Sequence, residues 1–179
     1  MVALVCFHGI FSLFFPIQDG FLGHDYSLAL PAYYDGALWF QNNGISAIPW
    51  FTPSFCGGQP FFADPQSSYF SLPQWLMFFL GPLTSLYILL MILASLQYWG
   101  IYILSRRVFH LSAWAASAAG VAFMFNTFVV HRMIIGHVGF HGFALVPWIT
   151  LLLVARWEIP VYPLNKGGNI VLAALLITY

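Results

Sequence analysis

Long apolar runs separated by short polar breaks dominate the chain. A helix that crosses a bilayer needs about 20 mostly apolar residues. Runs of this kind, or shorter ones that reach towards this length, cover residues 2–17, 84–105, 111–130, 133–154 and 169–179. The pattern therefore predicts an all-α integral membrane protein: a single multi-span helical bundle of about four to five spans.

A long polar and aromatic stretch, residues 18–72, interrupts this pattern after the first run. Pro31 is suited to a first helical position, and Asn42-Asn43-Gly44 supplies a stop signal. Between them an apolar stripe recurs at helical spacing, formed by Tyr33, Tyr34, Ala37 and Leu38. The stretch therefore predicts a loop that contains an amphipathic helix over residues 31–43, resting on the membrane surface.

The basic residues orient these spans. One predicted face of the membrane carries four of the five, namely Arg106, Arg107, Arg156 and Lys166, whereas Arg132 falls on the other face. Because cytoplasmic loops carry the excess of Lys and Arg, the first face is predicted to be cytoplasmic, together with the N-terminus. The loop of residues 18–72 and the short segment of residues 131–141 then lie outside.

Composition supports this class of protein. Hydrophobic residues make up 61% of the chain and charged residues 6%, whereas a soluble domain carries about 25% charged residues. The formal net charge of zero argues against a nucleic-acid partner. Both ends of the sequence fall inside apolar runs, which indicates a piece of a longer protein.

The segment "HRMIIGHVGFH" collects three candidate ligand-binding residues on the outer face. Arg132 is suited to hold a phosphate by charge-assisted hydrogen bonds, or alternatively to reach lipid headgroups as an interfacial arginine. His137 and His141 are four residues apart and share one side if the segment is helical. That spacing is compatible with a metal ion, although no acid lies within the segment.

The outer loop resembles a known family. "GHDYSLALPAYYDGALWF", followed by "IPWFTPSFCGGQPFFADPQSSYFSLPQ", is similar to the first extracytoplasmic loop of GT-C fold glycosyltransferases. These multi-span membrane enzymes transfer sugars from polyprenyl-phosphate carriers, and the likeness is to bacterial members that decorate cell-surface polymers. The resemblance extends over about the first 155 residues as topology plus one loop.

This resemblance implies roles for particular residues. An acid near the start of the loop, here Asp25, takes the proton of the acceptor hydroxyl, and Asp19 is the rival for that role. Asp64 and Gln59, from the proline and glycine turns further along, become candidate substrate-binding residues beside Arg132, His137 and His141. A helix-capping or turn role remains the alternative for the aspartates. Whether a divalent metal ion takes part is left open.

The implied partners are a polyprenyl-phosphate-linked sugar, a glycan, lipid or protein acceptor, and the bilayer itself. The alternative is a membrane protein without catalytic activity, such as a transporter or an assembly subunit for surface polysaccharide. Transporters place charged or helix-breaking residues near the membrane midplane, whereas the spans predicted here are almost free of charge. The sequence therefore favours the transferase.

Overall fold

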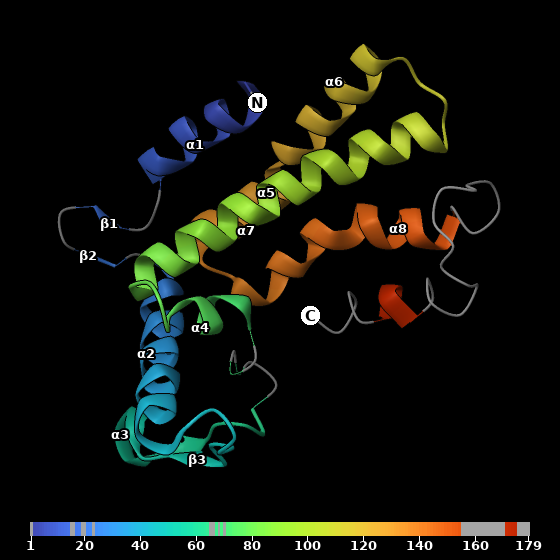
Figure 1. Ribbon diagram of the computed structural model, residues 1–179. Helices are drawn as coiled ribbons and strands as arrows, with labels where there is room; N and C mark the ends of the chain where they lie inside the picture. Colours follow the sequence, from blue (N-terminus) through green and yellow to red (C-terminus); the bar gives the residue numbers. More distant parts are fainter. Residues whose placement is uncertain are drawn as a thin grey trace. The chain divides into compact units, whose positions relative to one another are not determined.

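A computed structural model describes residues 2–14, 17–18, 21–22, 24–64, 67, 69, 71–154 and 171–174, which are mainly helical (Figure 1). The chain forms two compact units. The first unit joins residues 1–15 to residues 90–179, and the second unit comprises residues 16–89. Helix α5 (Pro82–Arg107) contributes its first turns to the second unit and its remainder to the first.

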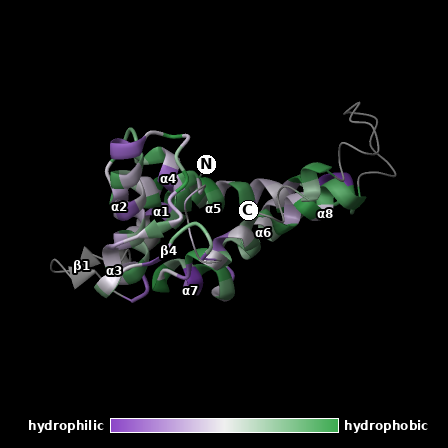
Figure 2. Ribbon diagram, turned by 90° about the horizontal axis from the view of Figure 1, so that it is seen from below, coloured by the Kyte–Doolittle hydropathy of each residue, from purple (hydrophilic) through white to green (hydrophobic). Residues whose placement is uncertain are grey.

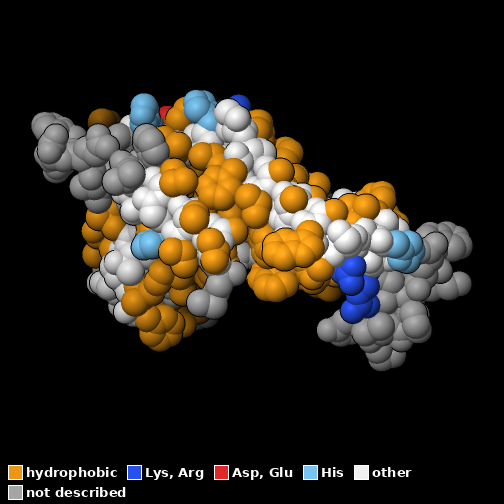
Figure 3. Space-filling view, turned by 90° about the horizontal axis from the view of Figure 1, so that it is seen from above, with side chains coloured by type: hydrophobic (Ala, Val, Ile, Leu, Met, Phe, Trp, Pro, Cys, Tyr) orange, Lys and Arg blue, Asp and Glu red, His pale blue; other side chains and the backbone are white. Residues whose placement is uncertain are grey.

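Two helical segments are long and apolar enough to cross a membrane. One is α5, with 26 residues, and the other runs over 23 residues from Ala113 to Ile135. The latter contains α6 (Ala113–Met124) and α7 (Thr127–Ile135). Hydrophobic colours extend along most of α5 in Figure 2, and hydrophobic side chains predominate on the face drawn in Figure 3. Core helices of soluble proteins also meet this criterion of length and composition.

The predicted number of four to five spans is wrong for the described residues, because breaks in the helices divide the apolar runs differently. Helix α1 (Val2–Phe14) has 13 residues and extends about 20 Å, short of a hydrocarbon core of about 30 Å. The predicted span 133–154 is divided at Gly136 into the end of α7, the 3-10 helix η1 (Val138–Leu145) and α8 (Val146–Val154). Most of residues 169–179 lie outside the described part of the chain.

Helix α2 (Tyr26–Asn43) occupies the place of the predicted surface helix but begins five residues earlier, so Pro31 lies inside it rather than at its start. Of the predicted apolar stripe, Tyr33 is buried, whereas two other members are exposed. Tyr34 and Leu38 are 52% and 55% exposed. The buried side instead consists of Tyr26, Leu30, Tyr33, Gly36 and Phe40. The buried face is set by the side chains that pack on it, among them Tyr69 against Phe40 and Gln74 against Gly36.

An aromatic cluster holds α2 against the rest of the second unit. The Phe40 ring stacks on Tyr69 at a centroid distance of 4.6 Å and contacts Trp75 of α4 (Leu72–Leu76) at 5.5 Å. The carbonyl oxygen of Ala47 accepts hydrogen bonds from the Tyr69 hydroxyl, at 2.6 Å, and from Trp39 Nε1, at 3.0 Å. The loop after α2 is therefore held in place by directed contacts.

A tight hairpin follows in the second unit. Strands β3 (Phe51–Thr52) and β4 (Gln59–Pro60) pair in antiparallel fashion, as do β1 (Ile17–Gln18) and β2 (Phe21–Leu22) earlier in the chain. Between β3 and β4, the short turn α3 (Ser54–Gly57) and the next residue give four successive positive φ angles, at Phe55, Cys56, Gly57 and Gly58. A hydrogen bond of 2.7 Å from Ser54 Oγ to Asp35 Oδ1 ties this turn to α2.

Small residues bring the helices of the first unit together. A Cβ atom on Gly100 of α5 would lie 2.9 Å from both Pro147 and Trp148 of α8, and Trp148 Nε1 donates to the Leu96 carbonyl at 2.8 Å. Gly120 of α6 lies similarly close to the Tyr98 ring of α5. At each crossing point a glycine on one helix thus makes room for a large side chain on the other.

We predict that Gly36→Ala destabilises the second unit by about 1–3 kcal/mol, because its methyl group would overlap the side-chain amide of Gln74. Gln74 is 1% exposed and its Nε2 donates to the Tyr33 carbonyl at 3.2 Å, so it cannot move aside without losing that bond. Thermal unfolding of the purified protein measures the effect.

Gly9→Ala is the matched control, since Gly9 is helical and its Cβ would meet nothing within 4 Å. It should stabilise slightly, by roughly 0.5–1 kcal/mol. Equal unfolding temperatures for Gly36→Ala and Gly9→Ala would contradict the close α2–α4 contact.

Candidate functional site

The end of helix α7 positions Arg132 and His137. The side chain of Asn126 caps the start of α7 by accepting from the Val129 amide at 2.9 Å. At the other end Gly136 takes a left-handed conformation, with φ of 86°, and its N–H donates to the Arg132 carbonyl at 3.1 Å. This turn brings His137 back towards the last helical turn, where Arg132 Nη1 bonds to His137 Nδ1.

The guanidinium group of Arg132 packs against a pair of phenylalanine rings that contact each other at a centroid distance of 6.1 Å. Its Cζ atom lies 4.5 Å from the ring centroid of Phe140 and 5.3 Å from that of Phe128. Phe143 contacts both rings, at centroid distances of 6.1 Å and 5.3 Å respectively. Cation–π attraction stabilises a guanidinium in this position, and Arg stacks on aromatic faces more readily than Lys.

His141 is the buried member of the group. It is 3% exposed, and neither ring nitrogen has a hydrogen-bond partner. His141 lies in η1, outside both long apolar helices. Burial, with a further contribution from the neighbouring His137, lowers the pKa of His141 from 6.5 to about 4. The imidazole is therefore neutral at pH 7.

The predicted helical relation between His137 and His141 is wrong. His137 precedes the 3-10 helix with non-helical angles, φ of −74° and ψ of 72°, so the two residues do not share an α-helical face. Among the residues that the structure describes, no group of three or more His, Cys, Asp or Glu side chains is placed to hold a metal ion. The guanidinium beside His137 also opposes a second cation there.

Asp25 stands immediately before α2, exposed to solvent. Its backbone carbonyl accepts from the amides of Leu28 and Ala29, both at 3.0 Å, but its side chain makes no capping hydrogen bond to the helix. The helix-capping alternative therefore does not account for this carboxylate. The next residue, Tyr26, anchors the helix end: it is fully buried, and burial together with Tyr33 raises its pKa.

The other candidates of the outer loop lie on separate elements of the second unit. Asp64 is half-buried in a turn, where its carbonyl accepts from the Ser67 amide at 2.9 Å. Gln59 lies in β4, paired with Thr52. Asp19 is outside the described residues. The sequence did not single out Asp35, whose bond to Ser54 fixes the left-handed turn; a hydroxyl 19 residues away gives no local signal.

The structure therefore gathers three of the predicted site residues, Arg132, His137 and His141, at the junction of α7 and η1 in the first unit. Figure 2 shows the hydrophilic colour of α7 among largely apolar helices. The outer-loop candidates belong to the second unit. The sequence does not predict the aromatic part of this site. Phe128, Phe140 and Phe143 contact one another in the structure but look like ordinary apolar residues in the sequence.

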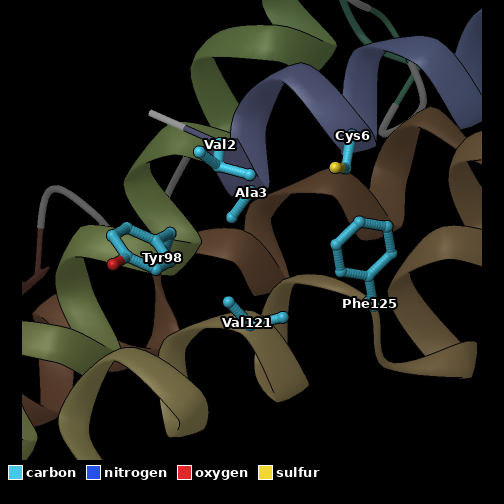
Figure 4. A pocket seen from close by; sticks show the side chains of 6 residues that line it. All are labelled: Val2, Ala3, Cys6, Tyr98, Val121 and Phe125. Carbon is cyan, nitrogen blue, oxygen red and sulfur yellow. The ribbon is translucent and has the colours of Figure 1, made fainter. Parts of the chain in front are cut away.

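A mostly apolar cavity of about 460 Å³ also lies in the first unit (Figure 4). Its lining comes from α1, α5, α6 and the residue after α6, and consists of Val2, Ala3, Cys6, Tyr98, Val121 and Phe125. The hydroxyl of Tyr98 is hydrogen-bonded to Ser117 at 3.1 Å. None of the predicted site residues lines this cavity, so it is separate from the Arg132 group.

Comparison with known proteins assigns no family. A scan against protein-family models, a search of curated proteins and a search of solved structures each found no match. The resemblance to GT-C transferases thus rests on the loop residues quoted above.

We predict that acid weakens the folded protein through His141. Between pH 6.5 and pH 4 the unfolded chain binds a proton at this residue while the folded chain does not, so stability falls as the pH is lowered through this window. Each pKa unit is worth about 1.4 kcal/mol, which gives a loss of roughly 3 kcal/mol by pH 4. Thermal unfolding from pH 7.5 to pH 4 measures it.

His141→Leu is the comparison that isolates this effect from the titration of the aspartates. At pH 7 the variant should be at least as stable as the parent, because it removes two unpaired buried nitrogens. The advantage should grow as the pH is lowered. Parallel pH profiles for the two proteins would show that His141 is accessible to water.

Proposed function

We propose that this chain is part of a multi-pass bacterial membrane glycosyltransferase that moves a sugar from a polyprenyl-phosphate carrier to an extracytoplasmic acceptor. The observation that carries the proposal is the arrangement around Arg132. The guanidinium packs on the rings of Phe140 and Phe128 and bonds to the imidazole of His137, and no carboxylate of the described residues neutralises it, so its charge stays available for an anion. A phosphate attached to a hydrocarbon chain matches both the charge and the apolar surroundings.

The charged residues of the two units support different roles for the units. In the described part of the first unit the ionisable residues of definite charge are Arg106, Arg107 and Arg132, and there is no acid. In the described part of the second unit they are Asp25, Asp35 and Asp64, and there is no Lys or Arg. The first unit is therefore suited to bind an anionic donor, and the second to accept a proton.

Asp25 is the proposed general base. The acceptor hydroxyl gives its proton to the Asp25 carboxylate as its oxygen attacks the anomeric carbon of the sugar. The bond between that carbon and the phosphate oxygen breaks, and the carrier phosphate leaves with the electron pair. Arg132 stabilises the negative charge of the departing phosphate. An exposed carboxylate that is not used to cap α2 is consistent with this role.

The membrane arrangement is part of the same proposal. Helices α5 and α6–α7 cross the bilayer, and Arg106 and Arg107 at the end of α5 mark the cytoplasmic side. Residues 18–72 and the α7–η1 junction then face outward, which puts Asp25 and Arg132 on the side where surface polymers are assembled.

One observation favours the alternative of a transporter or assembly subunit. Gln97 lies within α5, is 0% exposed, and neither its Oε1 nor its Nε2 has a hydrogen-bond partner. Polar side chains inside a membrane-spanning bundle mark substrate or ion pathways in transporters. If Gln97→Leu abolished function while Asp25→Asn did not, the transporter would replace the transferase.

Native cysteines test the orientation directly. Cys6 and Cys56 are the two cysteines of the chain, and both thiols are exposed. In a Cys6→Ala background, we expect a membrane-impermeant maleimide added to intact spheroplasts to label Cys56, because the loop faces outward. Cys56→Ala with Cys6 retained controls for labelling elsewhere. Labelling of Cys56 that requires lysed cells would place the loop in the cytoplasm and overturn the proposal.

Kinetics separate the two proposed roles. Asp25→Asn keeps the shape of the side chain but removes the base, so kcat should fall by about 10²–10⁴-fold with little change in KM. Arg132→Gln should chiefly raise KM for the lipid-phosphate donor, by roughly 10–100-fold, because ground-state charge-assisted bonds are lost. Transfer from polyprenyl-phosphate-linked hexoses and pentoses in membranes that contain the full protein is the measurement.

Arg107→Gln is the matched control for Arg132, since Arg107 is an exposed arginine at the end of α5. It should leave both constants close to those of the parent. Full transfer activity in Asp25→Asn membranes, with insertion confirmed by the cysteine assay, would exclude Asp25 as the base.

A further inference from the structure

The bond between Arg132 and His137 defines the protonation of the histidine. A guanidinium carries N–H donors and no acceptor, and it stays charged throughout the accessible pH range. Arg132 Nη1 must therefore donate, and His137 Nδ1 must accept. An accepting Nδ1 carries no proton, so His137 is the neutral tautomer with its proton on Nε2.

Two restraints together fix the guanidinium plane. The Phe140 and Phe128 rings restrict the position of its carbon, at 4.5 Å and 5.3 Å from their centroids, and His137 restricts the direction of one amino group. The rings alone would allow the group to rotate in its plane. The donors of Arg132 that do not bond to His137 consequently point in defined directions.

We infer that His137 is a positioning residue, which acts as a neutral hydrogen-bond acceptor to orient Arg132 for a phosphate monoester or diester. The inference rests on the proposed function, because it assumes that Arg132 binds the carrier phosphate. A free arginine side chain loses rotamer freedom when it is immobilised. A side chain that is already oriented loses less on binding, and the difference appears as affinity.

The local charges agree with this role. In the described part of the first unit no carboxylate competes for the guanidinium. His141, the neighbour that interacts electrostatically with His137, is buried and neutral. A carboxylate in place of His137 would orient Arg132 equally well but would cancel its charge. A neutral acceptor orients the group and leaves the charge for the ligand.

Binding of a short isoprenoid monophosphate, farnesyl phosphate, to the purified full chain in detergent tests the inference. His137→Leu removes the acceptor and should weaken binding by about tenfold. His137→Asn places a side-chain oxygen near the position of Nδ1 and should restore affinity to within about threefold of the parent. His131→Asn, which changes an exposed histidine of α7, is the matched control and should bind as the parent does.

Binding of farnesol, which lacks the phosphate, is the control for a general structural defect, because such a defect would weaken farnesol binding too. Its affinity should be the same in all these proteins, because His137 acts through Arg132 on the phosphate. In an Arg132→Gln background, His137→Leu should have no further effect on farnesyl phosphate. If His137→Leu fails to fold, as judged by thermal unfolding, His137→Ala takes its place in the series.

The outcomes distinguish the inference from the proposed function. If Arg132→Gln binds farnesyl phosphate as well as the parent, the phosphate site itself is wrong. If Arg132→Gln loses affinity but His137→Leu does not, the phosphate site stands and the positioning role is wrong. If His137→Asn is as weak as His137→Leu, or farnesol is lost in parallel, His137 does not act as the acceptor proposed here.

Discussion

The stabilisation of Arg132 without a carboxylate from the described residues is the constraint on which the α7–η1 junction depends. A buried or half-buried cation is costly unless other groups stabilise it. Here the stabilising groups are the faces of Phe128 and Phe140 and the imidazole of His137. The turn at Gly136 is necessary for this arrangement, since it returns the chain so that residues 137–140 reach the last turn of α7. The contacts of Arg132 and the turn at Gly136 thus belong to one local arrangement.

The sequence predicts the longest helix well and the shorter ones less well. The ends of α5 are marked by Gly81-Pro82 and by Arg106-Arg107, which are strong and local signals. The helix break at Asn126 and the helix end at Gly136 are single residues within apolar runs. Hydropathy averaged over a run does not detect them, so the predicted span boundaries are wrong. The predicted range of α2 begins five residues too late, because Pro31 signals a helix start in the sequence but lies inside the helix in the structure.

Some features of the candidate site follow from local sequence, whereas others depend on tertiary structure. Arg132, His137 and His141 were found from residue type and position, and they lie together because few residues separate them. The rings that hold Arg132, and the burial of His141, depend on how η1 folds back on α7, which no spacing rule encodes. Asp25 was found through the resemblance of its loop. Its capping alternative could be decided only from the geometry of the side chain.

Buried polar groups without partners give an independent argument that the first unit has a function beyond packing. His141 and Gln97 together bury four ring and amide atoms that make no hydrogen bond, and each such group costs about 1–3 kcal/mol. A leucine at either position would remove that cost. Because 61% of this chain is hydrophobic, apolar replacements are the common choice at buried positions, so the two polar residues stand out as costly exceptions. His141 lies beside the proposed phosphate site, where a neutral imidazole adds polarity without adding an opposing charge.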